Sequence, residues 1–401
     1  MPKAILHIDG DSFFASCEVS LDPRLKGKAL ITGQERGIVT AMSKEAKALG
    51  ISRGMPIFKV RKMFPQVIIK SSDYRTYEIF AHRMFAIVRK YADVEEYSID
   101  ECFALLDSWN GEMVLEIKNE LQSKLDVTFS LGLAPTKVLA KIASSTSKPD
   151  GLTILPPQQI DEFLKDVDIG KVWGIGPATS AELRRLGIKT ALDLKLRSAE
   201  WGRGHLDKPI LEIWHELNGV VVFEVNTSLA DFSKSIQVTR TFTPPSSNKE
   251  FLFSELSHNI EKACVKIRRE GQGSGRLAYF LKTQEFRYHR QEIELDLSVQ
   301  TPEIILKKVR ETFNSVFKPK LLYRATGVTL SRLVPQSQAQ NDLFGLIRKN
   351  NDWETIYGVV DALEGRFGSH SVILGSSLMA NKRRGGAIHR RLGIPYMGKV
   401  K

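Results

Sequence analysis

The stretch Ala4-Ile5-Leu6-His7-Ile8-Asp9 is an apolar segment that ends on a carboxylate. Its residues 4–8 predict a short buried strand, and residues 13–19 predict a helix after an intervening turn. A second acidic site, Asp100-Glu101, lies inside the strand-like run 94–106. An ionised carboxylate beside a buried strand is costly unless it is paired or bound to a cation. Both sites are therefore candidate cation ligands, although each alone is more simply explained as a turn residue at a strand end.

Outward from these two sites, helical and strand patterns alternate. Residues 73–91 repeat apolar positions at helical spacing, and the following runs predict strands at 94–106, a helix at 113–125, a strand at 129–133 and a helix from about 135. This order predicts an α+β fold in which helices cover a mixed sheet, interrupted by a small inserted module. Helices with glycine-rich turns follow as far as 217. A polar link at 227–235 then leads to two helices and several strands.

Adjacent residues on a regular strand point to opposite faces, so Asp100 and Glu101 can share one site only near a hairpin tip. We expect that tip at Ser98–Glu101. Together with Asp9, the pair would give three carboxylates that suit hard divalent cations such as Mg²⁺. Two such ions roughly 3.5–4 Å apart can support phosphoryl transfer.

The net charge of +12 is unevenly distributed along the chain. Residues 1–234 carry 31 Lys+Arg and 31 Asp+Glu, whereas residues 235–401 carry 27 and 15, so the second part holds the whole excess. A basic part joined to a neutral part indicates that the C-terminal region binds a polyanion. The alternative is a charge that serves solubility and is clustered by chance.

Composition excludes several other classes of protein. No apolar run approaches the roughly 20 residues needed to span a bilayer, so we expect no membrane association. An acidic residue occurs too early for a signal peptide. The three cysteines are scattered and form no CxxC pair. They indicate a reducing compartment, and we expect a cytoplasmic protein.

Two acidic motifs resemble the metal-binding motifs of Y-family (translesion) DNA polymerases. They are Ile8-Asp9-Gly10-Asp11-Ser12-Phe13-Phe14-Ala15-Ser16-Cys17-Glu18 and Tyr97-Ser98-Ile99-Asp100-Glu101. The similarity continues, in the family's order and spacing, over residues 1–330 or more. Its further motifs are Leu25-Lys26-Gly27-Lys28, Glu45-Ala46-Lys47-Ala48-Leu49-Gly50, Gly54-Met55-Pro56, Leu131-Gly132-Leu133-Ala134, Lys137-Val138-Leu139-Ala140-Lys141-Ile142-Ala143 and Ser147-Lys148-Pro149-Asp150-Gly151.

The resemblance implies a right-hand polymerase fold. It implies a ferredoxin-like palm at 1–20 and 73–160, small fingers at 21–72, a helical thumb with a helix-hairpin-helix at 161–228 and an α+β little finger at 235–335. A tail at 336–401 would follow. The implied activity is template-directed, low-fidelity DNA synthesis in lesion bypass and DNA repair. The DinB and UmuC branches both remain open. The alternative function is a catalytically weak scaffold that recruits partners to damaged DNA.

The same resemblance assigns roles around the active site. It makes Asp9, Asp100 and Glu101 the catalytic metal ligands, adds the Gly10 carbonyl, and implies two Mg²⁺ ions per site, with Mn²⁺ possible. The residues that it places around the dNTP are Ser12, Phe13, Phe14, Thr40, Lys47 and Lys148. Phe14 would be the steric gate against ribonucleotides, whereas Phe13 also fits a core position. Lys47 stands where many members have an arginine, and lysine lacks the bidentate fork.

Contacts to DNA and to a partner are implied further along the chain. The run from Val172 to Ile188 resembles a helix-hairpin-helix, in which Gly174 and Gly176 would offer backbone N–H groups to DNA phosphates. Basic residues of the third unit, Arg240, Lys282 and Arg287 among them, fit a sequence-independent DNA groove-binder. Gln340-Asn341-Asp342-Leu343-Phe344 resembles the bacterial sliding-clamp peptide, with Gln340, Leu343 and Phe344 as contacts. We expect a monomer, with an accessory subunit possible.

Overall fold

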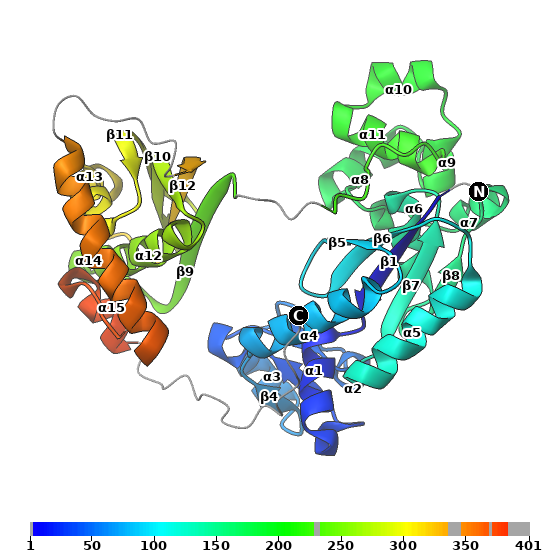
Figure 1. Cartoon of the computed structure of the whole chain (residues 1–401), viewed down its shortest axis with the longest axis horizontal. Coiled ribbons are helices and arrows are strands. Elements are labelled where there is room, and N and C mark those ends of the chain that lie inside the picture. Colours follow the sequence, from blue (N-terminus) through cyan, green and yellow to red (C-terminus); the bar gives the residue numbers. More distant parts are fainter. Residues whose placement is uncertain (1–2, 228–232, 336–345, 369–370, 384–401) are drawn as a thin grey trace. The chain divides into compact units, whose positions relative to one another are not determined.

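The computed structural model describes residues 3–227, 233–335, 346–368 and 371–383. These residues form two compact units, one ending before and one beginning after the break at 228–232 (Figure 1). The first unit contains a five-stranded and a three-stranded sheet, and the second contains a four-stranded sheet. Among the described helices, none combines the length and the apolar character that crossing a bilayer would require.

The five-stranded sheet has the order β5-β6-β1-β7-β8, with β1 (Ala4–Gly10) at its centre. Its other strands are β5 (Asp93–Glu96), β6 (Glu101–Leu106), β7 (Phe129–Ala134) and β8 (Leu152–Ile154). The central strand runs antiparallel to both neighbours, and every one of its residues is buried. β1 is therefore the buried strand ending near a carboxylate, Asp9, that the opening apolar segment predicts.

The two faces of this sheet carry different helices (Figure 1). Leu6 and Ile8 belong to a core with α4 (Tyr74–Val88) and α5 (Gly111–Leu125). Ile5 belongs to a second core with α6 (Lys137–Thr146). Because side chains alternate along a strand, His7 and Asp9 share the α6 face with Ile5. This alternation decides which side of the sheet carries the site.

A small module interrupts the main sheet between α1 (Phe13–Leu21) and α4. Its three strands have the order β3-β2-β4, with bounds Leu30–Thr32 for β2, Ala41–Met42 for β3 and Ile68–Lys70 for β4. Two short helices, α2 (Lys44–Ala48) and α3 (Ile57–Met63), complete a separate apolar core. The predicted inserted module is present.

A helical layer follows β8 and packs on α6. Its helices are α7 (Ile160–Leu164), α8 (Pro177–Arg185), α9 (Ala191–Lys195), α10 (Ala199–His205) and α11 (Lys208–Leu217). Glu216 of α11 is fully buried, and its carboxylate accepts a hydrogen bond from the Val138 N–H at 3.1 Å. The Thr136 hydroxyl donates to the Glu216 carbonyl at 2.9 Å. These contacts hold the beginning of α6 against the helical layer.

The second unit is an antiparallel sheet in the order β11-β10-β12-β9, packed on two helices. The strands are β9 (Ser235–Ser246), β10 (Gln272–Thr283), β11 (Tyr288–Val299) and β12 (Tyr323–Pro335), and the helices are α12 (Lys249–Arg269) and α13 (Pro302–Val316). The sequence pattern did not identify β9. It lies at a sheet edge, where most of its side chains are exposed and the apolar alternation is weak.

Part of the segment expected as a tail folds onto this unit. Residues 346–367 form α14 and residues 378–383 form α15. The Arg268 guanidinium of α12 donates to both carboxylate oxygens of Asp361 in α14, at 2.7 and 2.8 Å. Glu261 of α12 accepts from the Leu374 N–H at 2.6 Å and from the Ser377 hydroxyl. The described part beyond 345 is thus anchored by side chains of α12.

Candidate active site

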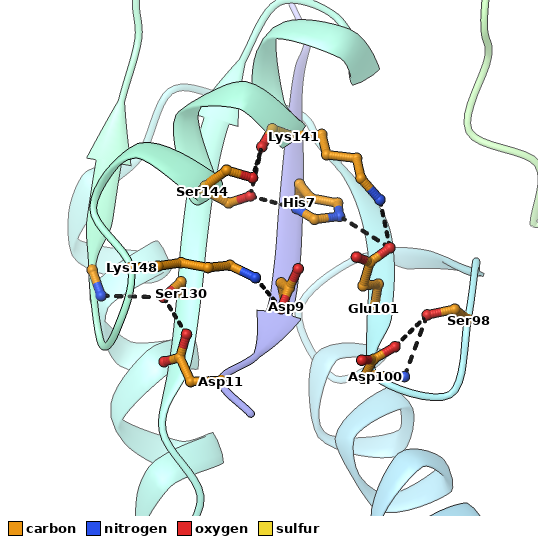
Figure 2. Close-up of polar contacts among 12 residues, drawn as sticks. His7, Asp9, Asp11, Ser98, Asp100, Glu101, Ser130, Lys141, Ser144 and Lys148 are labelled. Atoms are coloured by element: carbon orange, nitrogen blue, oxygen red, sulfur yellow. Dashed lines mark hydrogen bonds and ion pairs between the residues drawn. The ribbon is translucent and has the colours of Figure 1, made fainter. Parts of the chain in front are cut away.

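Three carboxylates gather at one end of the β1–β6 ladder. Asp9 and Glu101 are directly opposite each other in the antiparallel register. Asp100 lies in the turn that precedes β6, where the Tyr97 and Ser98 N–H groups both donate to the Glu101 carbonyl. The Gly10 N–H donates to the Asp100 carbonyl at 2.9 Å. The hairpin tip expected at Ser98–Glu101 therefore exists, and it brings Asp100 to the same end as Asp9 (Figure 2).

Two lysines balance this acidic cluster from the α6 side. Lys141 Nζ donates to Glu101 Oε2 at 2.5 Å, and Lys148 Nζ lies 2.5 Å from Asp9 Oδ1 (Figure 2). The Lys141 ammonium also lies 4.8 Å from the Tyr97 ring centroid and 5.5 Å from that of Trp173. The spacing of four residues between Lys137 and Lys141 fits a solvated helix face as well as a role in the site, so the sequence alone does not decide between them.

The ion pair of Lys137 with Glu95 shows that the face of α6 that carries both lysines is not simply exposed to solvent. Lys137, one turn before Lys141, is buried and forms an ion pair with Glu95 of β5. Glu95 does not line the cavity into which Asp9, Asp100 and Glu101 open. Two lysines four residues apart thus pair with carboxylates on two adjacent strands. Of these two carboxylates, only Glu101 belongs to the cavity.

Burial controls the electrostatics of Asp9, whose side chain is 10% exposed. Desolvation raises the pKa of Asp9 to about 7, a shift that Lys148 opposes and the nearby Glu101 reinforces. Like charges directly opposite each other on adjacent strands are destabilising. A hard divalent cation relieves this repulsion and takes oxygen ligands. The donor set therefore fits a divalent metal, which Asp9, Asp100 and Glu101 could hold together with the Gly10 carbonyl.

The carboxylates open into a cavity of about 600 Å³. Its lining includes, of the residues predicted for the site, Asp9, Gly10, Ser12, Phe13, Phe14, Lys47, Asp100, Glu101 and Lys148. The volume lies within the range of roughly 300–1,000 Å³ that is usual for small-ligand sites. Lys44 and Arg53 line it as well. One cavity thus joins the acidic cluster to cationic side chains of the inserted module.

Thr40 is placed differently from the other predicted residues. It is not part of the cavity lining, and its hydroxyl lies 2.9 Å from that of Thr32 and 3.2 Å from that of Ser72. Its carbonyl accepts a hydrogen bond from Arg53 Nε at 2.9 Å. Thr40 therefore positions Arg53, a lining residue that the sequence analysis did not identify.

Phe13 and Phe14 occupy different environments on α1. Phe13 is 3% exposed and belongs to the main core, as its alternative assignment predicts, and it also touches the cavity. Phe14 is half-buried and lines the cavity. Its ring stacks on Tyr77 with centroids 4.5 Å apart and meets Tyr74 edge-on at 5.5 Å. Aromatic contacts on two sides thus fix the ring that borders the cavity.

Asp11 has a structural role that the motif alone did not reveal. It is 6% exposed, and its carboxylate accepts from the Ser130 hydroxyl and from the Asp150 N–H, both at 2.8 Å. The bond from the Asp150 N–H ties the segment after β1 to the loop that carries Lys148, and the bond from Ser130 ties it to β7. The second aspartate of Ile-Asp-Gly-Asp therefore supports the site without facing the carboxylates of Asp9 and Glu101.

The residues expected to bind DNA lie in both units. In the first unit, Gly174 has φ +90°, and Gly176 is the N-terminal cap of α8 with open space around it. In the second unit, Arg240 and Arg287 are exposed, whereas Lys282 is half-buried and lies over the rings of Phe286 and Tyr288. The clamp-like residues Gln340, Leu343 and Phe344 lie outside the described residues.

Family models match most of the chain. The model of the impB/mucB/samB family matches residues 8–145, and the model of its C-terminal domain matches residues 233–343. Between them, the model of the IMS family HHH motif matches residues 157–188, which contain Gly174 and Gly176. The carboxylates, the glycine turn and the basic unit all fall within matched segments.

Curated relatives are similar over nearly the whole length. DNA polymerase IV of Desulfatibacillum aliphaticivorans is 30% identical over 391 residues, which cover 92% of this chain and 95% of that protein. DNA polymerase IV 1 of Bacillus subtilis (strain 168) is 29% identical, with 94% and 93% covered. Protein ImpB of Salmonella typhimurium is 30% identical, with 88% and 89% covered.

Solved structures agree with these relatives. A Y-family DNA polymerase chimera, Dbh-Dpo4(243-245)-Dbh, superposes with a TM-score of 0.71 and 26% identity, covering 83% of this chain and 99% of its own. An insertion ternary complex of Dbh DNA polymerase has a TM-score of 0.55 and 25% identity, with the same coverage.

Proposed function

The chain belongs to the impB/mucB/samB family of Y-family DNA polymerases, and we propose that Asp9, Asp100 and Glu101 are its catalytic carboxylates. As a member it is a translesion, DNA-directed DNA polymerase that acts on DNA and dNTPs. The observation that carries the assignment is the Asp9–Glu101 pair, directly opposed across β1 and β6 beside Asp100 in one cavity. An intact acidic cluster argues against the alternative of a catalytically weak scaffold.

The proposed cofactor is a pair of Mg²⁺ ions, which Mn²⁺ could replace. Bound metal would activate the primer 3′ hydroxyl and stabilise the oxygens of the departing pyrophosphate. Asp9 and Glu101 would hold it on the sheet, and Asp100 would reach it from the hairpin turn. Lys148 and Lys141 compensate the charges of Asp9 and Glu101 through their ion pairs.

The nucleotide would lie between the palm residues and the inserted module. Lys148, Lys47 and Arg53 line the cavity and supply positive charge for a triphosphate. Phe14 would lie against the sugar, where its ring leaves no room for a 2′-hydroxyl. The module itself is small, with three short strands and two short helices. An inserted module of this size would enclose the nascent base pair only loosely. Loose enclosure supports low fidelity and tolerance of damaged templates.

We assign the polymerase domains with the boundaries expected from the sequence. Residues 1–20 and 73–160 would be the palm, 21–72 the fingers, 161–228 the thumb and 235–335 the little finger. The little finger carries 17 Lys+Arg against 10 Asp+Glu, which supports sequence-independent DNA binding.

We further propose that the protein acts as a monomer in the cytoplasm and binds a sliding clamp through residues 340–344.

Primer extension tests the function directly. Purified protein is incubated with an undamaged primer–template, Mg²⁺ and one dNTP at a time. We expect addition chiefly of the complementary dNMP, together with frequent misinsertion. Repeating the assay with Mn²⁺ separates a metal preference from inactivity. Binding of the duplex without any extension in either metal would instead favour the scaffold function.

A further inference from the structure

His7 is a buried imidazole behind the acidic pair. It is fully buried on β1, two residues before Asp9 and on the same face of the sheet. Its Nε2 atom lies 3.9 Å from Glu101 Oε2, beyond hydrogen-bond distance, and has no hydrogen-bond partner among the described residues. A buried polar atom without a partner is costly. His7 Nε2 is therefore aimed at the carboxylates without a bond to either.

The other ring nitrogen determines what Nε2 can do. Nδ1 lies 2.7 Å from the Ser144 hydroxyl, and that hydroxyl donates its own hydrogen to the Lys141 carbonyl at 3.0 Å. Ser144 Oγ then accepts from His7, so the ring proton is on Nδ1 and Nε2 carries a lone pair. Metal-binding histidines characteristically donate their second ring N–H to a protein oxygen in this way, which fixes both tautomer and orientation.

Three donor atoms converge at this point. One ligand atom each from His7, Asp9 and Glu101 lies within 4.8 Å of the others. We propose that His7 Nε2 is a third ligand, beside Asp9 and Glu101, for a first-row transition-metal dication. Mg²⁺ selects oxygen ligands, whereas imidazole nitrogen suits first-row transition dications such as Fe²⁺ and Zn²⁺. Mn²⁺ is the weakest binder of that series and also takes oxygen ligands, but it is the member whose bound state reports directly on a coordinated nitrogen. The mixed donor set thus gives the acidic cluster a preference that its oxygens alone would not have.

This inference rests on the proposed function only in that Asp9 and Glu101 bind metal. It requires neither DNA nor nucleotide, so it can be tested on the free full-length chain. Mn²⁺ alone is the probe, because its unpaired electrons report directly on coordinated nitrogen nuclei. The readout is the electron spin-echo envelope modulation of the bound Mn²⁺, compared between protein at natural abundance and protein labelled with ¹⁵N only in histidine.

We expect ¹⁴N modulation from a coordinated imidazole in the unlabelled chain, replaced by ¹⁵N modulation in the labelled one. Selective labelling distinguishes histidine from the amines of Lys141 and Lys148. His7→Gln should abolish the signal and lower Mn²⁺ affinity about tenfold or more while Mg²⁺ affinity changes little. His82→Gln, at an exposed position on α4, is the matched control and should change neither.

Three results would overturn the proposal: a wild-type chain whose bound Mn²⁺ shows no histidine nitrogen, a nitrogen signal that survives in His7→Gln, or failure of the free chain to bind Mn²⁺. Where His7→Gln does not fold, the isotope comparison on the wild type still decides. Primer extension with Mg²⁺ forms a separate arm. If the wild-type chain does not extend the primer, the result counts against the proposed function. If the wild-type chain extends the primer normally but shows no nitrogen signal, the result counts only against His7 as a ligand.

Discussion

Asp9 and Glu101 occupy directly opposed positions on β1 and β6, and each is compensated by a different lysine, Lys148 for Asp9 and Lys141 for Glu101. The two lysines come from one short stretch, the helix α6 and the loop after it. Through Ser144, the same helix also holds His7 behind the pair. The charge balance of the site therefore depends on how α6 packs across the sheet.

Lys148 should matter for nucleotide affinity. Its ammonium reaches the cavity, so we expect Lys148→Gln to raise the KM for dNTP about 10–100-fold, since hydrogen bonds to charged groups contribute about 1.5–3 kcal/mol. Steady-state single-nucleotide insertion measures the change. Lys137→Gln is the matched control, because Lys137 pairs with Glu95 outside the cavity. Equal effects of the two substitutions would remove Lys148 from the nucleotide site.

Phe14 should select against ribonucleotides. Its ring borders the cavity, and Phe14→Ala would open space for a 2′-hydroxyl. We expect the dNTP to rNTP insertion ratio to fall about 10–100-fold, the discrimination that a steric contact of this size supplies. Tyr74→Leu is the control, because it removes a ring of the same cluster that does not line the cavity. An unchanged ratio in Phe14→Ala would make Phe14 a packing residue.

Gly174 and Gly176 should separate folding from DNA binding. Gly174 has φ +90°, and a Cβ there would lie 2.6 Å from Ile213 Cδ1, so Gly174→Ala should cost about 1–3 kcal/mol of unfolding free energy. Gly176 has φ −80° and open space, so Gly176→Ala should cost less than about 1 kcal/mol.

Gly176→Ala should nevertheless weaken duplex binding, because the added methyl group would lie where a DNA phosphate approaches the backbone at the start of α8. Urea denaturation and a duplex titration measure the two effects. Unaltered DNA affinity in Gly176→Ala would place the phosphate contact elsewhere.

The clamp-like peptide should act only on processivity. Leu343→Ala with Phe344→Ala removes the two apolar anchors of residues 340–344, and such anchors dominate peptide binding. We expect unchanged synthesis on short primers and loss of the longer products that a bacterial sliding clamp supports on a primed circle. Product length with and without clamp gives the answer. Full stimulation of the double variant would make this segment a linker.

The sequence predicted the parts of the site that depend on local pattern. The short apolar run at residues 4–8 predicted β1, and the adjacency of Asp100 and Glu101 required the turn that the structure contains. The family resemblance then identified the polymerase class, which the comparisons confirm. Each of these inferences needed only neighbouring residues or a motif in a known order.

The contacts that cross between elements could not be predicted in this way. Lys137 and Lys141 look equivalent on the helix, and only the stagger of β5 and β6 beneath them decides which carboxylate each one meets. The carboxylate of Asp11 accepts hydrogen bonds from Ser130 and from the Asp150 N–H, residues more than 100 positions away that no local pattern connects to it. Arg53 carries no local signal, because the Thr40 carbonyl that holds it is a backbone group.

The most direct test of the account compares three carboxylate-to-amide variants in primer extension. Asp9→Asn and Glu101→Gln remove the charges proposed to bind metal, whereas Glu95→Gln removes a carboxylate that pairs with the neighbouring Lys137 outside the cavity. We expect the first two to lose extension by about a thousandfold or more while binding the primer–template within a few-fold of wild type, because the basic second unit is unchanged. Glu95→Gln should retain most of its activity. Extension by Asp9→Asn or Glu101→Gln at the level of Glu95→Gln would contradict the assignment of the active site.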